Sequence, residues 1–171
     1  MDKLNSIRHD KTQIDMVKMR KYRLNRVREQ LQSLGYGGIV IFDPVNLRYA
    51  TGSRNMQVFM LRNPGRYVFI PTQGSVVLFD FPNCEHLSEG LETIDEVRPA
   101  LTMSYVAAGY NLNDVANQWA KEIADLMRQH AGSNNKIAVD QIHPAGAIAL
   151  ANEGMRVVDG QEPIEHARSI K

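Results

Sequence analysis

The stretch DPVNLRYATGS, residues 43 to 53, marks a change from strand to helix. Asp43-Pro44 is a turn pair, and proline is favoured as the first residue of a helix because its missing N–H would have no partner there. Gly52 can end that helix, since glycine readily adopts the left-handed backbone found at helix ends. The stretch therefore predicts a turn and then a short helix. Its inward side chains would be those of Leu47 and Ala50 or Thr51.

The residues before this turn predict a long helix and then a buried strand. GGIVIF (37 to 42) is a short apolar run rich in β-branched residues, typical of a strand buried on both faces. Asp15 can cap a preceding helix that Gly35 closes. GYGG (35 to 38) lies between a helix and a strand, the reverse of the order in a dinucleotide site, so we interpret it as a helix end. Apolar residues recur on one face of the helix at Met16, Met19, Leu24, Val27, Leu31 and Leu34.

Strand and helix signals alternate through the rest of the chain. Two β-rich runs joined by a four-residue turn predict a hairpin over 66 to 81. An amphipathic helix is expected from Asn113 to about His130. Further strands are expected at 93 to 98, 136 to 140 and 155 to 159, and a further helix at 144 to 153. The pattern predicts an α/β domain with a mixed sheet flanked by helices.

Composition indicates an ordinary globular domain of 171 residues, with 43% hydrophobic and 23% charged content. A net charge of +1 provides no field that would attract nucleic acid. No apolar run approaches the roughly 18 residues that span a bilayer, and the N-terminus lacks a signal peptide. We therefore expect a cytoplasmic protein with no membrane or nucleic-acid partner. A single cysteine, Cys84, excludes an internal disulfide.

Reactive side chains are concentrated in FDFPNCEH (79 to 86), which contains Asp80, Cys84, Glu85 and His86. A thiolate activated by histidine is conceivable, but no oxyanion loop is visible, so a loop with a partly buried thiol is the favoured interpretation. His143 and His166 have no visible metal-ligand partners and are expected to be structural or solvated.

Basic residues dominate the polar side of the first helix. A phosphate-binding face would also need aromatic residues to stack on bases, and these are sparse. We therefore favour a solvated face, or one paired with an acidic neighbouring subunit or domain. The residues are Lys18, Arg20, Lys21, Arg23, Arg26 and Arg28.

The opening stretch resembles a known motif, Pro-x-Asn-x-x-Tyr-x-Thr-Gly, in the N-terminal domain of the creatinase, prolidase and aminopeptidase-P family, the pita-bread metallohydrolases. The matching residues are Pro44, Asn46, Tyr49, Thr51 and Gly52. Three further stretches are similar to that domain and occur in the same order, so the resemblance spans nearly the whole chain. They are LQSLGYGGIVIF, RYVFIPTQGSVVLFD and EPIEHARSIK. It implies the creatinase/prolidase N-terminal fold, which contains a ribonuclease H-like motif.

The resemblance also implies a division of the chain into an N-terminal arm (1–14), the domain itself (15–160) and the start of a helix (161–171) that links to a C-terminal pita-bread catalytic domain. We expect Pro163 at the first position of that helix, and no stop signal follows. Ile164, Ala167 and Ile170 would form its apolar stripe. In the family, two Asp, one His and two Glu hold a dinuclear divalent metal in the catalytic domain, so no catalytic or metal-binding residue is assigned here.

Within the family, the chain is most similar to lyases that cleave dimethylsulfoniopropionate. This similarity lies in the stretches MRKYRLNRVREQL, DPVNLRYATGSRNMQVF and VLFDFPNCEHLS. The resemblance implies a non-catalytic dimerisation and substrate-access domain, working with its own catalytic domain in a homodimer on a small zwitterionic substrate. An Xaa-Pro dipeptidase, an aminopeptidase or a creatinase-like hydrolase is the alternative enzyme class. A protein-binding module without metal ligands, or a free-standing α/β binding protein, is the non-enzymatic alternative.

In related dimers the loop after the motif reaches the neighbouring subunit's active site. The resemblance therefore makes Arg54, Met56, Phe59 and Arg62 candidates for substrate-lining or dimer contacts. Arginine can pair with a substrate carboxylate in a bidentate manner, and the apolar pair can exclude water. The alternative is a half-buried strand with the Met and Phe in the core and the arginines in solvent.

Overall fold

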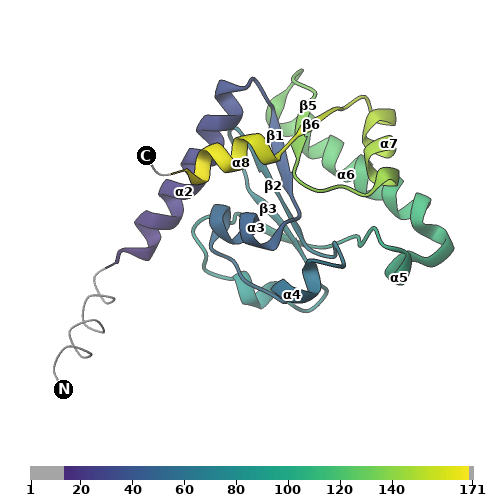
Figure 1. Cartoon of the computed structure of the whole chain (residues 1–171), viewed down its shortest axis with the longest axis horizontal. Helices are drawn as coiled ribbons and strands as arrows, with labels where there is room; N and C mark the ends of the chain where they lie inside the picture. The colour runs from purple at the N-terminus through teal and green to yellow at the C-terminus, as the bar shows by residue number, and fades with distance from the viewer. Residues whose placement is uncertain (1–13, 170–171) are drawn as a thin grey trace.

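The computed structural model describes residues 14–169, which fold as a six-stranded sheet between two layers of helices (Figure 1). The strand order is β4-β3-β2-β1-β5-β6, in which β2 is antiparallel to both neighbours and the other pairings are parallel. The predicted mixed α/β sheet and its hairpin are therefore confirmed. The strands are β1 (Gly38–Ile41), β2 (Tyr67–Pro71), β3 (Val77–Asp80), β4 (Glu96–Pro99), β5 (Lys136–Val139) and β6 (Arg156–Asp159).

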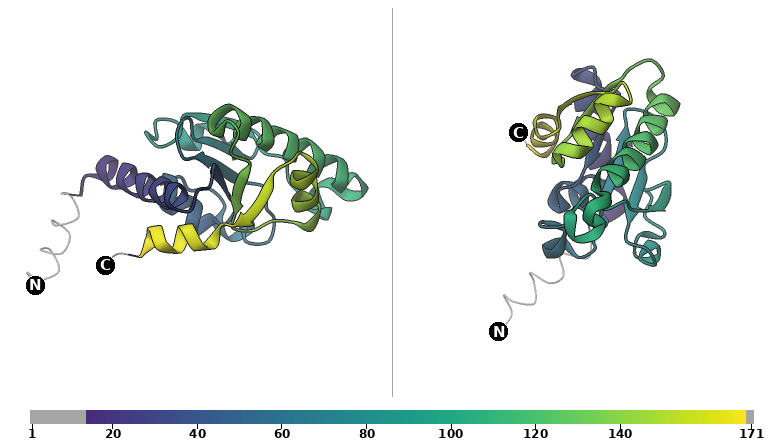
Figure 2. Two further views of the ribbon diagram at one scale, coloured as in Figure 1. Left: turned by 90° about the horizontal axis from the view of Figure 1, so that it is seen from above. Right: turned by 90° about the vertical axis from the view of Figure 1, so that its right-hand side faces the viewer.

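Helices cover both faces of the sheet. One face carries α2 (Met16–Ser33), α3 (Pro44–Thr51) and α8 (Gln161–Arg168), and the other carries α6 (Leu112–Ala131) and α7 (Pro144–Asn152) (Figure 2). Short turns of helix, α4 (Gln57–Met60), η2 (Glu85–Ser88), α5 (Tyr105–Ala108) and η3 (Gly109–Asn111), lie in the connections.

Strand β1 shows why the central strands are apolar throughout. Ile39 and Ile41 pack under α2, α3 and α8, whereas Val40 packs under α6 on the opposite face. Each such side chain contributes roughly 1.5–3 kcal/mol when fully buried. The prediction of a strand buried on both faces is confirmed.

Helix α2 begins and ends where the sequence predicts. The Asp15 side chain accepts a hydrogen bond from the Lys18 N–H (2.9 Å), and Gly35 follows the helix with a φ of +68°. Met16 lies on the predicted apolar stripe but is exposed, because the first turns of α2 project beyond the sheet (Figure 1).

Helix α8 departs from the prediction at its start. It begins at Gln161, two residues before Pro163, because the Asp159 carboxylate accepts hydrogen bonds from the N–H groups of Gln161 (3.3 Å) and Glu162 (3.2 Å). The helix ends at Arg168 although no glycine follows. Ile164 and Ala167 are buried as expected. Ile170 and most of the expected arm (1–14) lie outside the described residues.

Candidate functional site

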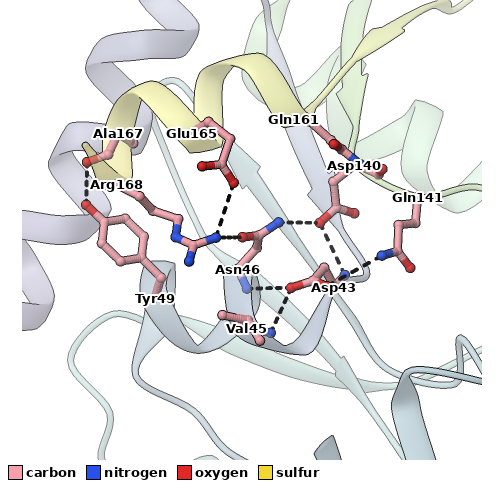
Figure 3. A network of polar contacts seen from close by, with 10 residues as sticks. All are labelled: Asp43, Val45, Asn46, Tyr49, Asp140, Gln141, Gln161, Glu165, Ala167 and Arg168. Carbon is pink, nitrogen blue, oxygen red and sulfur yellow. Dashed lines mark hydrogen bonds and ion pairs between the residues drawn. The ribbon is translucent and has the colours of Figure 1, made fainter.

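Two motif residues of α3 reach across to the C-terminal helix α8 (Figure 3). The Asn46 amide donates to Asp140 Oδ2 (3.2 Å), and its oxygen accepts from Arg168 Nη1 (3.0 Å). The Tyr49 hydroxyl donates to the carbonyl of Ala167 (2.6 Å). The motif thus ties α8 to the end of β5. We call the contacts among Asn46, Tyr49, Asp140, Ala167 and Arg168 the α8 latch.

Asp140 is the buried carboxylate of the α8 latch, at the carboxyl end of β5 and only 7% exposed. It accepts from the N–H groups of Phe42 (2.8 Å) and Asp43 (3.2 Å) as well as from Asn46. Burial raises the pKa of Asp140 to about 6 against the opposing effect of these hydrogen bonds. At neutral pH the carboxylate is ionised, and it organises the start of α3. The sequence analysis missed Asp140; the available signal was its position directly after a strand.

Arg26 of α2 binds the other side of the same helix end. Its Nε donates to the Ala167 carbonyl (2.6 Å), and Nη2 donates to the carbonyls of His166 (3.1 Å) and Ser169 (3.0 Å). Carbonyls in the last turn of a helix have no partner within the helix, and a cation there also complements the helix dipole. The end of α8 is therefore held from both α2 and α3.

The basic face of α2 is used within the domain, contrary to the expectation of a solvated or intersubunit face. Arg20 makes a bidentate ion pair with Glu92 (2.7 and 2.8 Å). The Arg23 guanidinium lies over the Tyr49 ring, 5.3 Å from its centroid. Together with Arg26, these arginines attach α2 to other segments of the same chain, so the expectation was wrong for them.

The remaining motif residues shape the backbone. Pro44 is the first residue of α3, as predicted. Thr51 Oγ1 donates to the Leu47 carbonyl (2.8 Å) and accepts from the Ser53 N–H (3.1 Å). Gly52 ends the helix with a φ of +81°, and a Cβ at this position would overlap the Arg20 side chain. Each motif residue thus has a conformational or helix-anchoring role.

The four candidate contact residues lie on the segment after the motif, residues 54–62, which we call the 54–62 loop. The alternative of a half-buried strand is wrong, because Gln57–Met60 form α4 and Met56 adopts a left-handed backbone with a φ of +36°. Arg54, Met56, Phe59 and Arg62 are all exposed. These four residues therefore present two cations and two large apolar groups to solvent, and Val58 and Leu61 of the same loop are exposed as well.

One of these four residues, Arg62, borders a cleft. Arg62 lies at the edge of a cleft of about 310 Å³ near the carboxyl ends of β1 and β5. Phe42 and Met60 contribute buried apolar surface to it, and Tyr105 and His143 contribute polar groups. This is the place where α/β sheets commonly bind ligands, since the chains leaving β1 and β5 pass to opposite faces.

The reactive side chains of residues 79 to 86 do not form a catalytic group. Asp80 is completely buried in an ion pair with Arg66, while Cys84 is partly buried before the turn η2. His143 accepts a hydrogen bond from the Ala145 N–H (3.2 Å) and so caps α7. His166 is exposed on α8.

Over residues 14–169, no group of three or more His, Cys, Asp or Glu side chains is placed to hold a metal ion. The described residues therefore do not fit a dinuclear metal. In the same part of the chain, no helix combines the length and apolar character needed to cross a bilayer.

Known proteins are similar to this chain in sequence. The family model of the creatinase/prolidase N-terminal domain matches residues 23–170. A dimethylsulfoniopropionate lyase, DddP, of Roseobacter denitrificans is 36% identical over 157 residues, and the same lyase of Roseovarius nubinhibens is 34% identical. Each match covers 92% of this chain but only 35% of the relative, so the chain spans about a third of their length.

A solved structure agrees in fold. The structure of an Xaa-Pro aminopeptidase from Streptococcus pyogenes superposes with a TM-score of 0.59 at 18% identity, covering 90% of this chain and all of that one. The family match includes the α8 latch and the 54–62 loop within residues 23–170. The chain belongs to the creatinase/prolidase N-terminal domain family.

Proposed function

We propose that this chain is the N-terminal, non-catalytic domain of a metal-dependent dimethylsulfoniopropionate lyase. Its substrate chemistry would take place on a dinuclear metal in a C-terminal catalytic domain, in a cytoplasmic homodimer. The observation that carries the proposal is the identity of 36% and 34% to two such lyases over 92% of the chain. The likeness to the Xaa-Pro aminopeptidase supports the fold alone.

The domain would contribute in two ways. The α8 latch would hold the helix that leads toward the catalytic domain, because Asn46 and Tyr49 bind its last turn. The 54–62 loop would take part in substrate access or dimer contact. Arg62 would pair with the substrate carboxylate, since it is a cation at the edge of a partly apolar cleft.

Kinetics of the protein that includes the catalytic domain test the role of the loop. Replacing Arg62 by alanine is expected to raise KM for the substrate about tenfold or more, because a charged hydrogen-bonded pair is lost. Arg54→Ala tests the second cation in the same way. Arg156→Ala is the matched control, because Arg156 is an exposed arginine at the first position of β6, which is parallel to β5, and so lies at the end of the strands opposite to the cleft. Unchanged kcat/KM in a stable dimer of both loop variants would remove these residues from the proposed site.

A peptidase is the second candidate, because the family model that matches residues 23–170 is that of the creatinase/prolidase N-terminal domain. Release of proline from Xaa-Pro dipeptides by the complete protein, without cleavage of dimethylsulfoniopropionate, would favour it. A protein that cleaves neither substrate and binds no metal would instead be a protein-binding module.

A further inference from the structure

A buried ion pair lies beneath the start of the 54–62 loop. Arg66, which precedes β2, donates from Nε to Asp80 Oδ2 (2.8 Å) at the end of β3. Their side chains are 2% and 0% exposed. Four segments meet here, since the pair also contacts Ser53 and Asn55 before α4, and Ser53 contacts Ser88 in η2.

The ion pair holds the loop through directional hydrogen bonds. The Asn55 amide donates to Asp80 Oδ1 (2.9 Å), and Arg66 Nη2 donates to the Ser53 hydroxyl. The same hydroxyl lies 2.6 Å from that of Ser88. The Asp80 carboxylate and the Arg66 guanidinium therefore each form one hydrogen bond to this segment in addition to their ion pair.

Side chains alternate between buried and exposed from Ser53 to Met56. Ser53 and Asn55 point into the buried cluster, whereas Arg54 and Met56 are exposed. Met56 also has a φ of +36°, a left-handed conformation that residues other than glycine adopt only where their surroundings determine it. Fixing Ser53 and Asn55 therefore fixes the direction in which Arg54 and Met56 project.

Stability alone does not account for the pair. Removing two charges from water costs about as much free energy as their attraction returns, so well-packed apolar residues are often equally stable at such positions. Apolar residues could not hold Asn55 and Ser53 by hydrogen bonds. We propose that Arg66 and Asp80 are positioning residues that keep the 54–62 loop in one conformation, with Arg54 and Met56 projecting outward. Their importance for activity rests on the proposed function of this loop.

The double variant Arg66→Met with Asp80→Leu separates positioning from stability. It fills a similar volume and removes both charges, but Asn55 loses its acceptor and must turn to water. We expect a thermal midpoint near that of the wild type. We also expect the backbone NMR order parameters of Arg54 and Met56 to fall from about 0.85 to below about 0.6, with α6 unchanged.

A matched control is Arg98→Met, which breaks a half-exposed ion pair with Glu96 and should leave the 54–62 loop ordered. If the double variant does not fold, Asn55→Ala keeps the ion pair and removes one of its two hydrogen bonds to this segment, so the order parameters of Arg54 and Met56 should also fall. Unchanged order parameters at Arg54 and Met56 in a folded double variant, or in Asn55→Ala, would overturn the proposal. These measurements use no substrate, so their outcome is independent of whether the parent enzyme is a lyase.

Discussion

Replacing Asn46 by alanine tests the α8 latch directly. The variant loses one hydrogen bond to the Asp140 carboxylate (3.2 Å) and one from the Arg168 guanidinium (3.0 Å). Hydrogen bonds to charged groups contribute about 1.5–3 kcal/mol when buried, but the Arg168 side chain is 36% exposed and its bond is weakened by solvent. Asp140 keeps its two backbone donors. We expect the free energy of unfolding to fall by about 2 kcal/mol.

For a domain of this length, that loss corresponds to a decrease in Tm of roughly 4–8 °C, measured by circular dichroism. Hydrogen exchange should accelerate in α8 more than in α6, because the lost contacts hold α8 and α6 packs on the other face. Asn117→Ala, at an exposed position of α6, is the control and should not lower Tm, since alanine is the better helix former. A Tm within about 1 °C of the wild type and unchanged exchange in α8 would refute the reasoning.

Two further perturbations have defined outcomes. The raised pKa of Asp140 means that its contribution to stability is present below about pH 4 and is lost as pH rises through about 6. Urea unfolding should therefore show the stability of the wild type relative to Asp140→Asn decreasing between those values, by at most about 3 kcal/mol; a constant difference would contradict the assigned titration. Gly52→Ala should be more destabilising than Gly35→Ala, which costs about 1 kcal/mol. Both positions have positive φ, but only at Gly52 would the new Cβ overlap a side chain. Equal Tm values for the two variants would mean that Arg20 moves aside at no cost.

The residues of the motif themselves were sufficient to predict where α3 begins and ends. Pro44 begins α3 and Gly52 ends it, as expected from the propensities of single residues. The start of α8 differs from the prediction because the proline preference was weighed without the Asp159 side chain, which accepts hydrogen bonds from the N–H groups of Gln161 and Glu162. A side-chain acceptor ahead of a helix can thus override a preference for proline at the first position.

The candidate site was less predictable because its contacts join distant parts of the chain. Asn46 forms hydrogen bonds with Asp140 and Arg168, which lie 94 and 122 positions further along the chain. No spacing rule relates such distant positions. The 54–62 loop likewise owes its conformation to Arg66 and Asp80 in the following hairpin. Its apolar residues suggested a half-buried strand, but Met56 and Phe59 are exposed, and the buried side chains at the start of this segment are the polar ones of Ser53 and Asn55.

The arginines of α2 illustrate the same point. In the sequence they form a basic face typical of solvent exposure, yet Arg26 binds carbonyls some 140 residues further along the chain. The guanidinium group of arginine is planar and carries several N–H donors, so it can form hydrogen bonds to several carbonyl groups at a helix end. Arg26 of α2 and Tyr49 of the motif therefore both bind the Ala167 carbonyl at the end of α8.

The proposal that the parent protein is a dimethylsulfoniopropionate lyase is tested most directly by measuring dimethyl sulfide release. The protein should be expressed with the coding sequence downstream of Lys171 and incubated with dimethylsulfoniopropionate, with and without a chelator. The account predicts release of dimethyl sulfide that the chelator abolishes. A metal-loaded, folded protein that releases no dimethyl sulfide, but frees proline from Xaa-Pro dipeptides, would contradict it.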